Sequence, residues 1–130
     1  MMPTDPSELQ YGDITGKIIG AVFEVHKFLG NGFQEVIYQR ALAYELLQAG
    51  LAFEREISQE IFYRDLPKPI GTRRADFVVE GKVLVEIKAV AVLEHVHWAQ
   101  VLNHLRAYRF EVGLLLNFGS KSMTFKRFVL

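Results

Sequence analysis

The chain has 130 residues, and its 15 Lys and Arg balance its 15 Asp and Glu, so the formal net charge is zero. Bulk charge therefore attracts neither nucleic acid nor an anionic membrane, and any polyanion binding has to come from a local patch. The lack of cysteine excludes disulfides, a thiolate nucleophile and cysteine-ligated zinc. With no apolar run near the ~20 residues of a membrane span and no secretory signal pattern, we expect a cytoplasmic protein with no membrane partner.

The N-terminal third of the chain predicts an arm and two helices. Residues 1–12 are polar and contain prolines, which indicates a flexible N-terminal arm before a single domain over residues 13–130. From Asp13, a plausible N-cap, apolar residues recur at three- and four-residue spacing and predict an amphipathic helix that ends at Gly30. A second helix is expected over about 33–49.

The rest of the chain predicts mostly strands. Segment 52–63 has the composition of an exposed edge strand, and a hairpin with a turn at Gly81 follows. A third helix is expected over about 94–109. Two further strands are predicted, over 112–117 and 123–129. This order predicts an α/β (mixed α+β) fold in which a mixed central β-sheet is flanked by helices.

The predicted hairpin alternates in polarity. Outside its turn, apolar residues occupy the odd positions of the two strands, and the charged residues Arg74, Asp76, Glu86 and Lys88 occupy even positions. Side chains of a strand point alternately to its two faces, so two carboxylates and a lysine are expected on one patch of sheet. This holds for any register in which the paired residue numbers have an even sum.

Such a patch has two readings. Two carboxylates about 4 Å apart repel by ~4 kcal/mol at an effective dielectric of 20, which a proton, the Lys88 ammonium or a divalent cation would offset. Carboxylate oxygens without imidazole or thiolate suit Mg²⁺ or Mn²⁺, and Lys88 would orient a water or balance charge on a phosphate. The alternative is an exposed salt-bridge ladder. Val78 and Leu84 share this face, which indicates a covering helix and weighs against a ladder.

Two helices offer side chains that could complete a site. Glu35 shares a helical stripe with Tyr38 and Leu42, although with Gly32 as N-cap it would be the N3 residue and serve as a capping group instead. Gln100 and His104 lie on one face of the third helix, where Gln100 could bind a water or a phosphate, or simply belong to a polar face.

Four other residues have simpler readings. His95 and His97 point apart on a helix, so we expect surface or packing roles rather than a metal pair. His26 is expected to be a hydrogen-bonded core residue, and Trp98 a core or interface residue.

The segment 25–38, with Gly32, Glu35 and Tyr38, resembles the signature of the GxxExxY family, which is grouped with the PD-(D/E)xK nuclease-like superfamily. The similarity extends through Asp76, the Glu86–Lys88 segment and Gln100 to the last strand.

The resemblance implies a restriction-endonuclease-like core with a metal-dependent site. Asp76 and Glu86 would ligate Mg²⁺, with Glu35 as a further acidic ligand, and Lys88 would assist the attacking water. Gln100, Tyr38 and Arg74 would support the site. The chain departs from the pattern in having Ala75 before Asp76 and in having His104 where relatives often place a tyrosine.

Three functional hypotheses follow. The first is a Mg²⁺- or Mn²⁺-dependent nuclease that hydrolyses the backbone of DNA or RNA. The second is a non-catalytic nucleic-acid- or protein-binding module on the same fold, which the neutral charge and the small size favour. The third is a homo-oligomer with an interface formed by Trp98 and the strand that carries Phe125 and Phe128.

Overall fold

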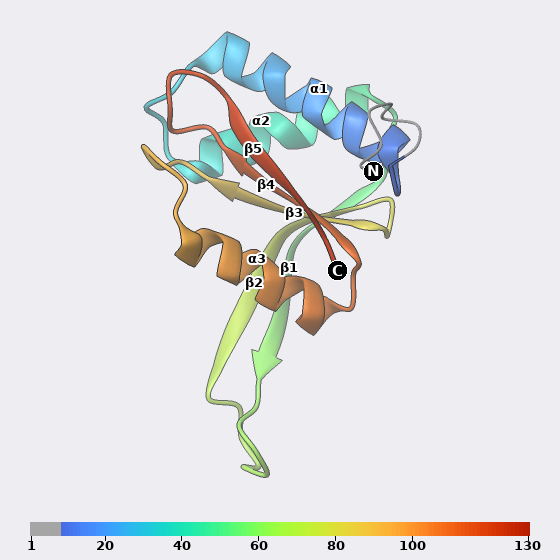
Figure 1. Cartoon of the computed structure of the whole chain (residues 1–130), viewed down its shortest axis with the longest axis vertical. Coiled ribbons are helices and arrows are strands. Elements are labelled where there is room, and N and C mark those ends of the chain that lie inside the picture. Colours follow the sequence, from blue (N-terminus) through green and yellow to red (C-terminus); the bar gives the residue numbers. More distant parts are fainter. Residues whose placement is uncertain (1–8) are drawn as a thin grey trace.

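The computed structural model describes residues 9–130, which form three helices and five strands (Figure 1). In chain order the elements are α1 (Gly12–Leu29), α2 (Glu35–Gln48), β1 (Phe53–Ile61), β2 (Gly71–Val79), β3 (Val83–Lys88), α3 (His95–Tyr108), β4 (Val112–Asn117) and β5 (Thr124–Val129). This is the predicted order. Most of the expected N-terminal arm, residues 1–8, lies outside the described residues.

The strands form one mixed sheet in the order β1-β2-β3-β4-β5. Only β3 and β4 are parallel, and α3 connects them; the other neighbours are antiparallel. The β2–β3 register pairs Phe77 with Val85, so the paired numbers have an even sum, as the alternation required. The predicted mixed sheet flanked by helices is therefore confirmed.

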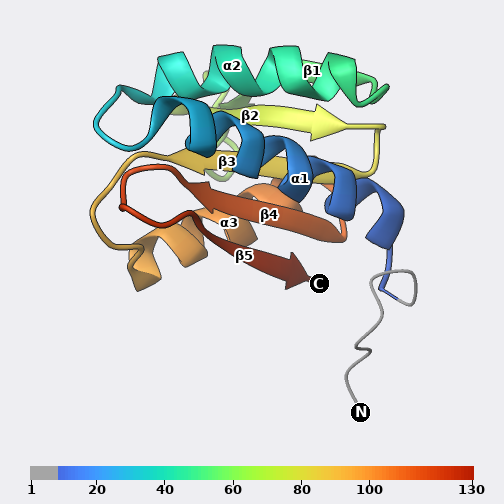
Figure 2. The same cartoon turned by 90° about the horizontal axis from the view of Figure 1, so that it is seen from above.

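Helices cover both faces of the sheet (Figure 2). On one face α1 and α2 pack against the apolar side of β2, β3 and β4, including Phe77, Val85 and Leu114. On the other face Val101 and Leu105 of α3 cover a second cluster that contains Val78 and Leu84. The helix that Val78 and Leu84 predicted over the charged face is α3, and the charged residues lie beside it rather than on an open sheet.

Helix boundaries differ from the predictions by one or two residues. Helix α1 begins at Gly12, after Tyr11 in a left-handed conformation, so Asp13 lies within the first turn and is not the N-cap. Helix α2 begins at Glu35 with Gln34 as N-cap. A capping box with Gly32 at its start is therefore wrong, because the chain is still turning through Gly32, whose φ is +104°. Helix α3 was predicted to within a residue.

Alternation along β2 breaks at Asp76. Val78 packs on the α3 side as the pattern requires, but the odd-numbered Ala75 packs on that side as well, together with Ile57 of β1. In β1, Glu56 lies opposite Asp76. Its φ is positive, at 52°, and the β1–β2 pairing is interrupted there. The hairpin therefore twists at this level, and its outer part leaves the body of the protein (Figure 1).

In the part of the chain that the structure describes, no helix is both long and apolar enough to cross a membrane.

Candidate active site

Strands β2 and β3 separate where Asp76 faces Glu86, and the gap between them forms the floor of a pocket. Their regular pairing ends at Phe77 and Val85. Beyond that pair the backbone N–H of Ile87 donates a hydrogen bond of 2.7 Å to Oδ2 of Asp76, so a side chain replaces the missing ladder contact. Asp76 thus supplies a hydrogen-bond acceptor for a backbone N–H of β3 that would otherwise have no partner.

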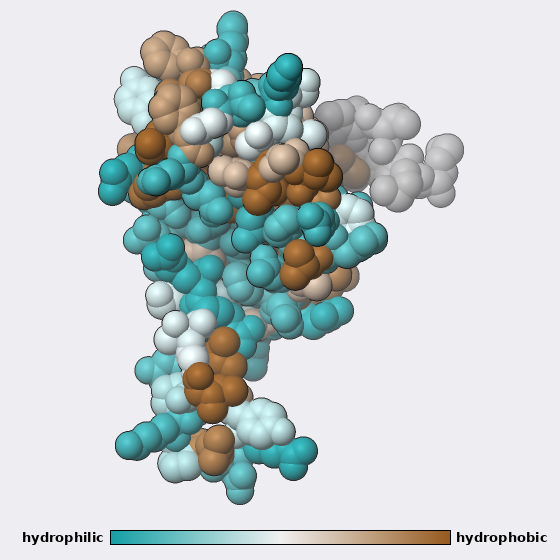
Figure 3. Space-filling model, turned by 90° about the vertical axis from the view of Figure 1, so that its left-hand side faces the viewer, coloured by the Kyte–Doolittle hydropathy of each residue, from teal (hydrophilic) through white to brown (hydrophobic). Residues whose placement is uncertain are grey.

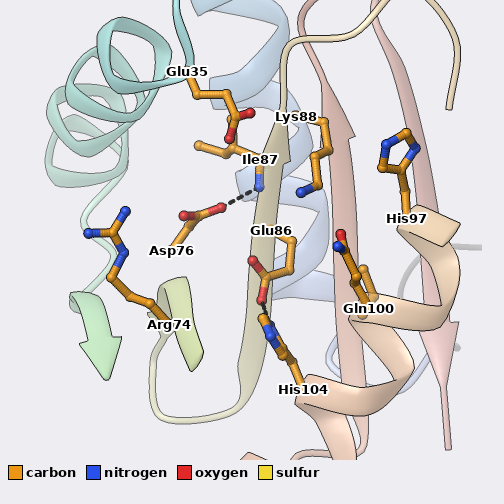
Figure 4. A pocket seen from close by; sticks show the side chains of 10 residues that line it. Glu35, Arg74, Asp76, Glu86, Ile87, Lys88, His97, Gln100 and His104 are labelled. Atoms are coloured by element: carbon orange, nitrogen blue, oxygen red, sulfur yellow. Dashed lines mark hydrogen bonds and ion pairs between the residues drawn. The ribbon is translucent and has the colours of Figure 1, made fainter. Parts of the chain in front are cut away.

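The pocket is a cavity of about 260 Å³ between α3, the start of α2 and the ends of β2 and β3 (Figure 4). It brings together six of the seven residues predicted for the site: Glu35, Arg74, Asp76, Glu86, Lys88 and Gln100. Ile87, His97, Val101 and His104 complete its lining. Residues spread over positions 35–104 of the sequence are thus assembled into one polar pocket, the arrangement that a catalytic or binding site requires.

Asp76 is the most perturbed acid of the pocket. Burial first, and then the negative charge of Glu86, raise its pKa to about 6, although the Ile87 N–H and the Lys88 charge oppose this shift. Desolvation and a neighbouring like charge both favour the protonated acid. A cation near Asp76 and Glu86 would relieve both costs, as the repulsion argument from the sequence anticipated.

Glu86 is buried, with 6% of its surface exposed, and its carboxylate has a direct side-chain partner. Oε1 of Glu86 is paired with Nδ1 of His104 from α3. The sequence placed His104 on the same helix face as Gln100 and indicated a departure from a tyrosine at that position, without assigning it a partner. In the structure this departure supplies the direct partner of a site carboxylate, because one turn of helix separates it from Gln100 at the pocket wall.

Glu35 lies at the mouth of the pocket and points inward (Figure 4). It is the first residue of α2, where the helix dipole favours a carboxylate, yet the Gln34 N-cap makes no side-chain capping bond and Glu35 is not an N3 capping group. Burial raises the pKa of its carboxyl, and the nearby Lys88 and His97 partly offset this. The carboxylate therefore faces the site rather than its own helix end.

Three further predicted residues line the same pocket with different exposure. Lys88 is half-buried and projects from the end of β3 into the pocket, whereas Gln100 and Arg74 are exposed. Arg74 also forms a loose ion pair of 3.9 Å with Glu56 across the hairpin. The pocket thus carries positive charge on two sides of the carboxylate pair.

Tyr38 does not belong to the pocket lining. Its ring is fully buried and stacks on Phe118 with a centroid distance of 4.6 Å. Its hydroxyl donates to the Gly30 carbonyl at 2.6 Å and accepts from the Phe33 N–H at 3.2 Å. Tyr38 thus fixes the turn between α1 and α2, which in turn sets where α2 starts and where it holds Glu35.

Replacing Tyr38→Phe should therefore lower the free energy of unfolding by about 1–2 kcal/mol, because two partly buried hydrogen bonds to the backbone are lost. Urea denaturation would measure the change. The exposed Tyr44 provides a control, since Tyr44→Phe should leave stability unchanged. A Tyr38→Phe protein as stable as the wild type would show that water satisfies this turn equally well.

Two pocket contributions were not anticipated from the sequence. Gln39 is buried, accepts a 3.0 Å hydrogen bond from Arg55 and approaches Oδ1 of Asp76 through Nε2 at 3.5 Å. Its position one helical turn after Glu35 was the available signal. His97 lines the pocket while its Nδ1 accepts the Glu94 N–H at the start of α3, so its packing role was predicted but its place at the site was not.

The remaining expectations concern His26 and Trp98. His26 is half-buried, and its Nε2 hydrogen-bonds the Ser120 carbonyl at 3.0 Å, as expected. Trp98 is partly buried against the α3-side cluster and lies under the Lys126 ammonium, at 4.9 Å from the ring centre.

The donor set suits a divalent ion held by two protein carboxylates. Within residues 9–130 no group of three or more His, Cys, Asp or Glu side chains is already arranged to hold an ion. Mg²⁺ in phosphoryl-transfer sites is commonly bound by one or two carboxylates together with substrate phosphates and waters. Asp76 and Glu86, whose mutual repulsion a cation would offset, fit that pattern.

Comparison with known proteins defines the class of the fold first. A crystal structure of a protein named SSO0001 matches 95% of this chain with a TM-score of 0.55 and 19% sequence identity. The chain spans 62% of that protein's length. No curated protein shows significant sequence similarity.

The family follows from the sequence match. The family model of the PD-(D/E)XK nuclease superfamily matches residues 12–128, nearly the whole chain. The protein therefore belongs to the PD-(D/E)XK nuclease superfamily, and its mixed sheet flanked by three helices is consistent with a restriction-endonuclease-like fold. The resemblance to the PD-(D/E)xK superfamily, stated from the segment 25–38 and extended through Asp76 and the Glu86–Lys88 segment, is confirmed at the level of the superfamily.

Proposed function

We propose that the protein is a divalent-metal-dependent nuclease that hydrolyses phosphodiester bonds of DNA or RNA. The observation that carries this proposal is the pairing of Asp76 and Glu86 at the gap between β2 and β3, with Lys88 projecting into the same pocket. Membership of a nuclease superfamily supports the reaction class. The use of a divalent metal and the choice of DNA or RNA as substrate are part of the proposal.

Each pocket residue has a proposed role set by its position. Asp76 and Glu86 would hold Mg²⁺ or Mn²⁺, which when bound supplies Lewis-acid stabilisation of phosphate charge and acidifies a neighbouring water. Lys88 would orient the attacking water and balance charge that develops on the phosphate. Gln39 and His104 would hold the two carboxylates in place, each by a hydrogen bond.

The remaining predicted residues would act at the pocket mouth. Glu35 would bind a water of the metal shell from the start of α2, Gln100 would bind the water or a phosphate oxygen, and Arg74 would contact the nucleic-acid backbone. Within the superfamily we assign the chain to the GxxExxY group, on Gly32, Glu35 and Tyr38. We also propose that residues 13–130 act as a single domain, and that the protein works in the cytoplasm.

Metal binding is the first property to test. We expect Mn²⁺ to bind the wild-type protein with measurable heat in a calorimetric titration and to raise its melting temperature, because a ligand of the native state stabilises that state. Asp76→Ala should remove both effects. Heat that is equal for the wild type and for Asp76→Ala would place the binding elsewhere and remove the metal centre from the proposal.

Cleavage is tested with DNA and RNA in single- and double-stranded forms, each with Mg²⁺, with Mn²⁺ and with EDTA. We expect metal-dependent cleavage of at least one form. If the folded protein binds metal through Asp76 but cuts none of these nucleic acids, the nuclease proposal fails, and a binding module on the same fold remains.

A further inference from the structure

The outer part of the β1–β2 hairpin stands away from the body of the protein and has no core of its own (Figure 1). Beyond the Ile57–Ala75 pair, which still packs on the α3-side cluster, we define residues 58–74 as the distal hairpin. Its strands continue to pair as far as Ile61 and Gly71. Apart from hydrogen bonds between α3 and its residues Gln59 and Arg73, this two-stranded ribbon has neither face covered, so its exposed side chains do not contribute to a core.

The tip of the distal hairpin exposes large apolar side chains. Phe62, Tyr63, Leu66 and Ile70 have 49–60% of their surface exposed, and apolar atoms are visible along the projection in Figure 3. Exposing several such residues together on a small projection is costly unless a partner covers them. The tip is nevertheless ordered, because Leu66 N–H donates to the Tyr63 carbonyl and Ile70 N–H to the Ile61 carbonyl.

The charge of the distal hairpin indicates the chemistry of a partner that would cover its tip. In a chain of zero net charge, this segment has four basic residues against two acidic ones. The basic residues are Arg64, Lys68, Arg73 and Arg74, and the acidic residues are Glu60 and Asp65. At the tip the Arg64 guanidinium lies over the Tyr63 ring at 5.5 Å, which combines a cation with an aromatic face. Positive charge interleaved with exposed apolar side chains is complementary to phosphates and bases.

The distal hairpin is also anchored to the candidate active site. Arg74 belongs both to its base and to the pocket lining. Tyr108, at the end of α3, donates hydrogen bonds to the carbonyls of Ile57 and Arg73, one in each strand. Gln59 donates to the Ala107 carbonyl at 3.3 Å. The helix that forms one wall of the pocket therefore holds the base of the projection at a defined position beside it.

We propose that the distal hairpin is a clamp for double-stranded nucleic acid, which it holds against the Asp76–Glu86 pocket; this rests on the nuclease function proposed above. A two-stranded β-ribbon has the width that the major groove admits, and the groove is about 8.5 Å deep. At about 3.3 Å per residue, the strand from Arg74 to Gly71 already spans this depth, and the tip reaches beyond it. Arg64 and Lys68 bind phosphates, while Phe62 and Tyr63 contact bases.

The test removes the tip without disturbing the strands below it. Residues 62–70 are replaced by an Asn-Gly turn that joins the paired Ile61 and Gly71, and thermal unfolding checks that the fold is kept. Binding of a DNA duplex, an RNA duplex and the matching single strands is measured by fluorescence anisotropy in EDTA, which prevents cleavage. We expect the trimmed protein to lose about tenfold or more in duplex affinity and any preference for duplex over single strand.

Two point variants separate charge from apolar contact. Arg64→Gln with Lys68→Gln should weaken duplex binding and reduce the slope of log K against log salt by about 2, since two phosphate contacts are removed. Phe62→Ala with Tyr63→Ala should weaken binding without changing that slope. The matched control is Lys17→Gln with Lys27→Gln on α1, which removes two exposed charges far from the pocket and should bind as the wild type does.

The outcomes distinguish this proposal from the nuclease function on which it rests. Metal-dependent hydrolysis of a small diester, bis(p-nitrophenyl) phosphate, should be equal for the wild-type and trimmed proteins if only the clamp is lost. A wild type that binds duplexes through the tip but cuts nothing would support the clamp and remove the nuclease. A trimmed protein with wild-type duplex affinity, or a wild type without nucleic-acid affinity, would overturn the clamp. So would light scattering in which trimming only converts a dimer to a monomer.

Discussion

Lys88→Met should reduce kcat for nucleic-acid cleavage by 10²- to 10³-fold, which corresponds to about 3–4 kcal/mol of lost transition-state stabilisation. Lys88 projects into the pocket beside Asp76 and Glu86, and its charge already lowers the pKa of Asp76 against the effect of burial. Methionine keeps the length of the side chain and removes its charge. The loss should appear in single-turnover cleavage of whichever nucleic acid the wild type cuts best.

Mn²⁺ binding provides the second readout for Lys88→Met. Removing a positive charge from beside two carboxylates should leave Mn²⁺ affinity equal or tighter, so the loss of activity cannot be attributed to a lost metal. Lys82→Met is the matched control, since Lys82 lies in the turn at the opposite end of β3 and is exposed. If Lys88→Met retained wild-type kcat, Lys88 would have no part in catalysis.

Asp76→Asn should make the metal-free protein more stable at neutral pH by roughly 2 kcal/mol. In the folded protein the pKa of Asp76 is raised from 3.8 to about 6, mainly by burial and then by the charge of Glu86. A shift of about two pKa units corresponds to ~3 kcal/mol of cost for the ionised form. Asparagine keeps an acceptor for the Ile87 N–H, but its amide NH₂ replaces Oδ1, which Nε2 of Gln39 approaches, so two donors meet and the gain is reduced.

The gain should depend on pH in a defined direction. Because the folded pKa is the higher one, the native state binds more protons than the unfolded state between about pH 4 and pH 6. Wild-type stability should therefore fall as pH rises through this window, and the Asn variant should lack this part of the slope. The two proteins should be equally stable below pH 4 and differ fully above pH 6.

Urea denaturation in EDTA at pH 4 and pH 7.5 measures this difference. Asp65→Asn, in the exposed tip of the distal hairpin, is the control and should change neither value. An Asp76→Asn protein that is less stable than the wild type at pH 7.5 would falsify the idea that this site stores electrostatic repulsion. A stabilised but inactive variant is the usual consequence of removing a functional charge.

Local sequence patterns were sufficient for most of the fold because they depend on periodicity. Apolar spacing located all three helices to within two residues, and the alternation of residues 77–88 identified the two faces of the hairpin. Errors occurred at helix starts, where backbone geometry decides: α2 begins at Glu35 since the chain turns through Gly32, and no side-chain pattern shows that.

Alternation alone predicted the part of the site whose residues are close in sequence, whereas Glu35 and Gln100 were assigned to it through the family resemblance. Asp76 and Glu86 face each other because of the hairpin register, which the even sum of paired positions anticipated. Tyr38 was assigned to the site through the family resemblance, yet its hydroxyl holds the Gly30 turn. A motif in one helix cannot show whether each of its side chains meets the pocket or the core.

By itself, the sequence determined the acidic pair, its lysine and the strands that carry them, because period-two alternation is a local property of the chain. Tertiary structure decided the rest. It placed His104 on Glu86 and Gln39 beside Asp76, brought Glu35 to the rim of the pocket, and projected residues 58–74 beside the pocket. These contacts depend on how helices dock on a twisted sheet, and packing between distant segments sets that docking.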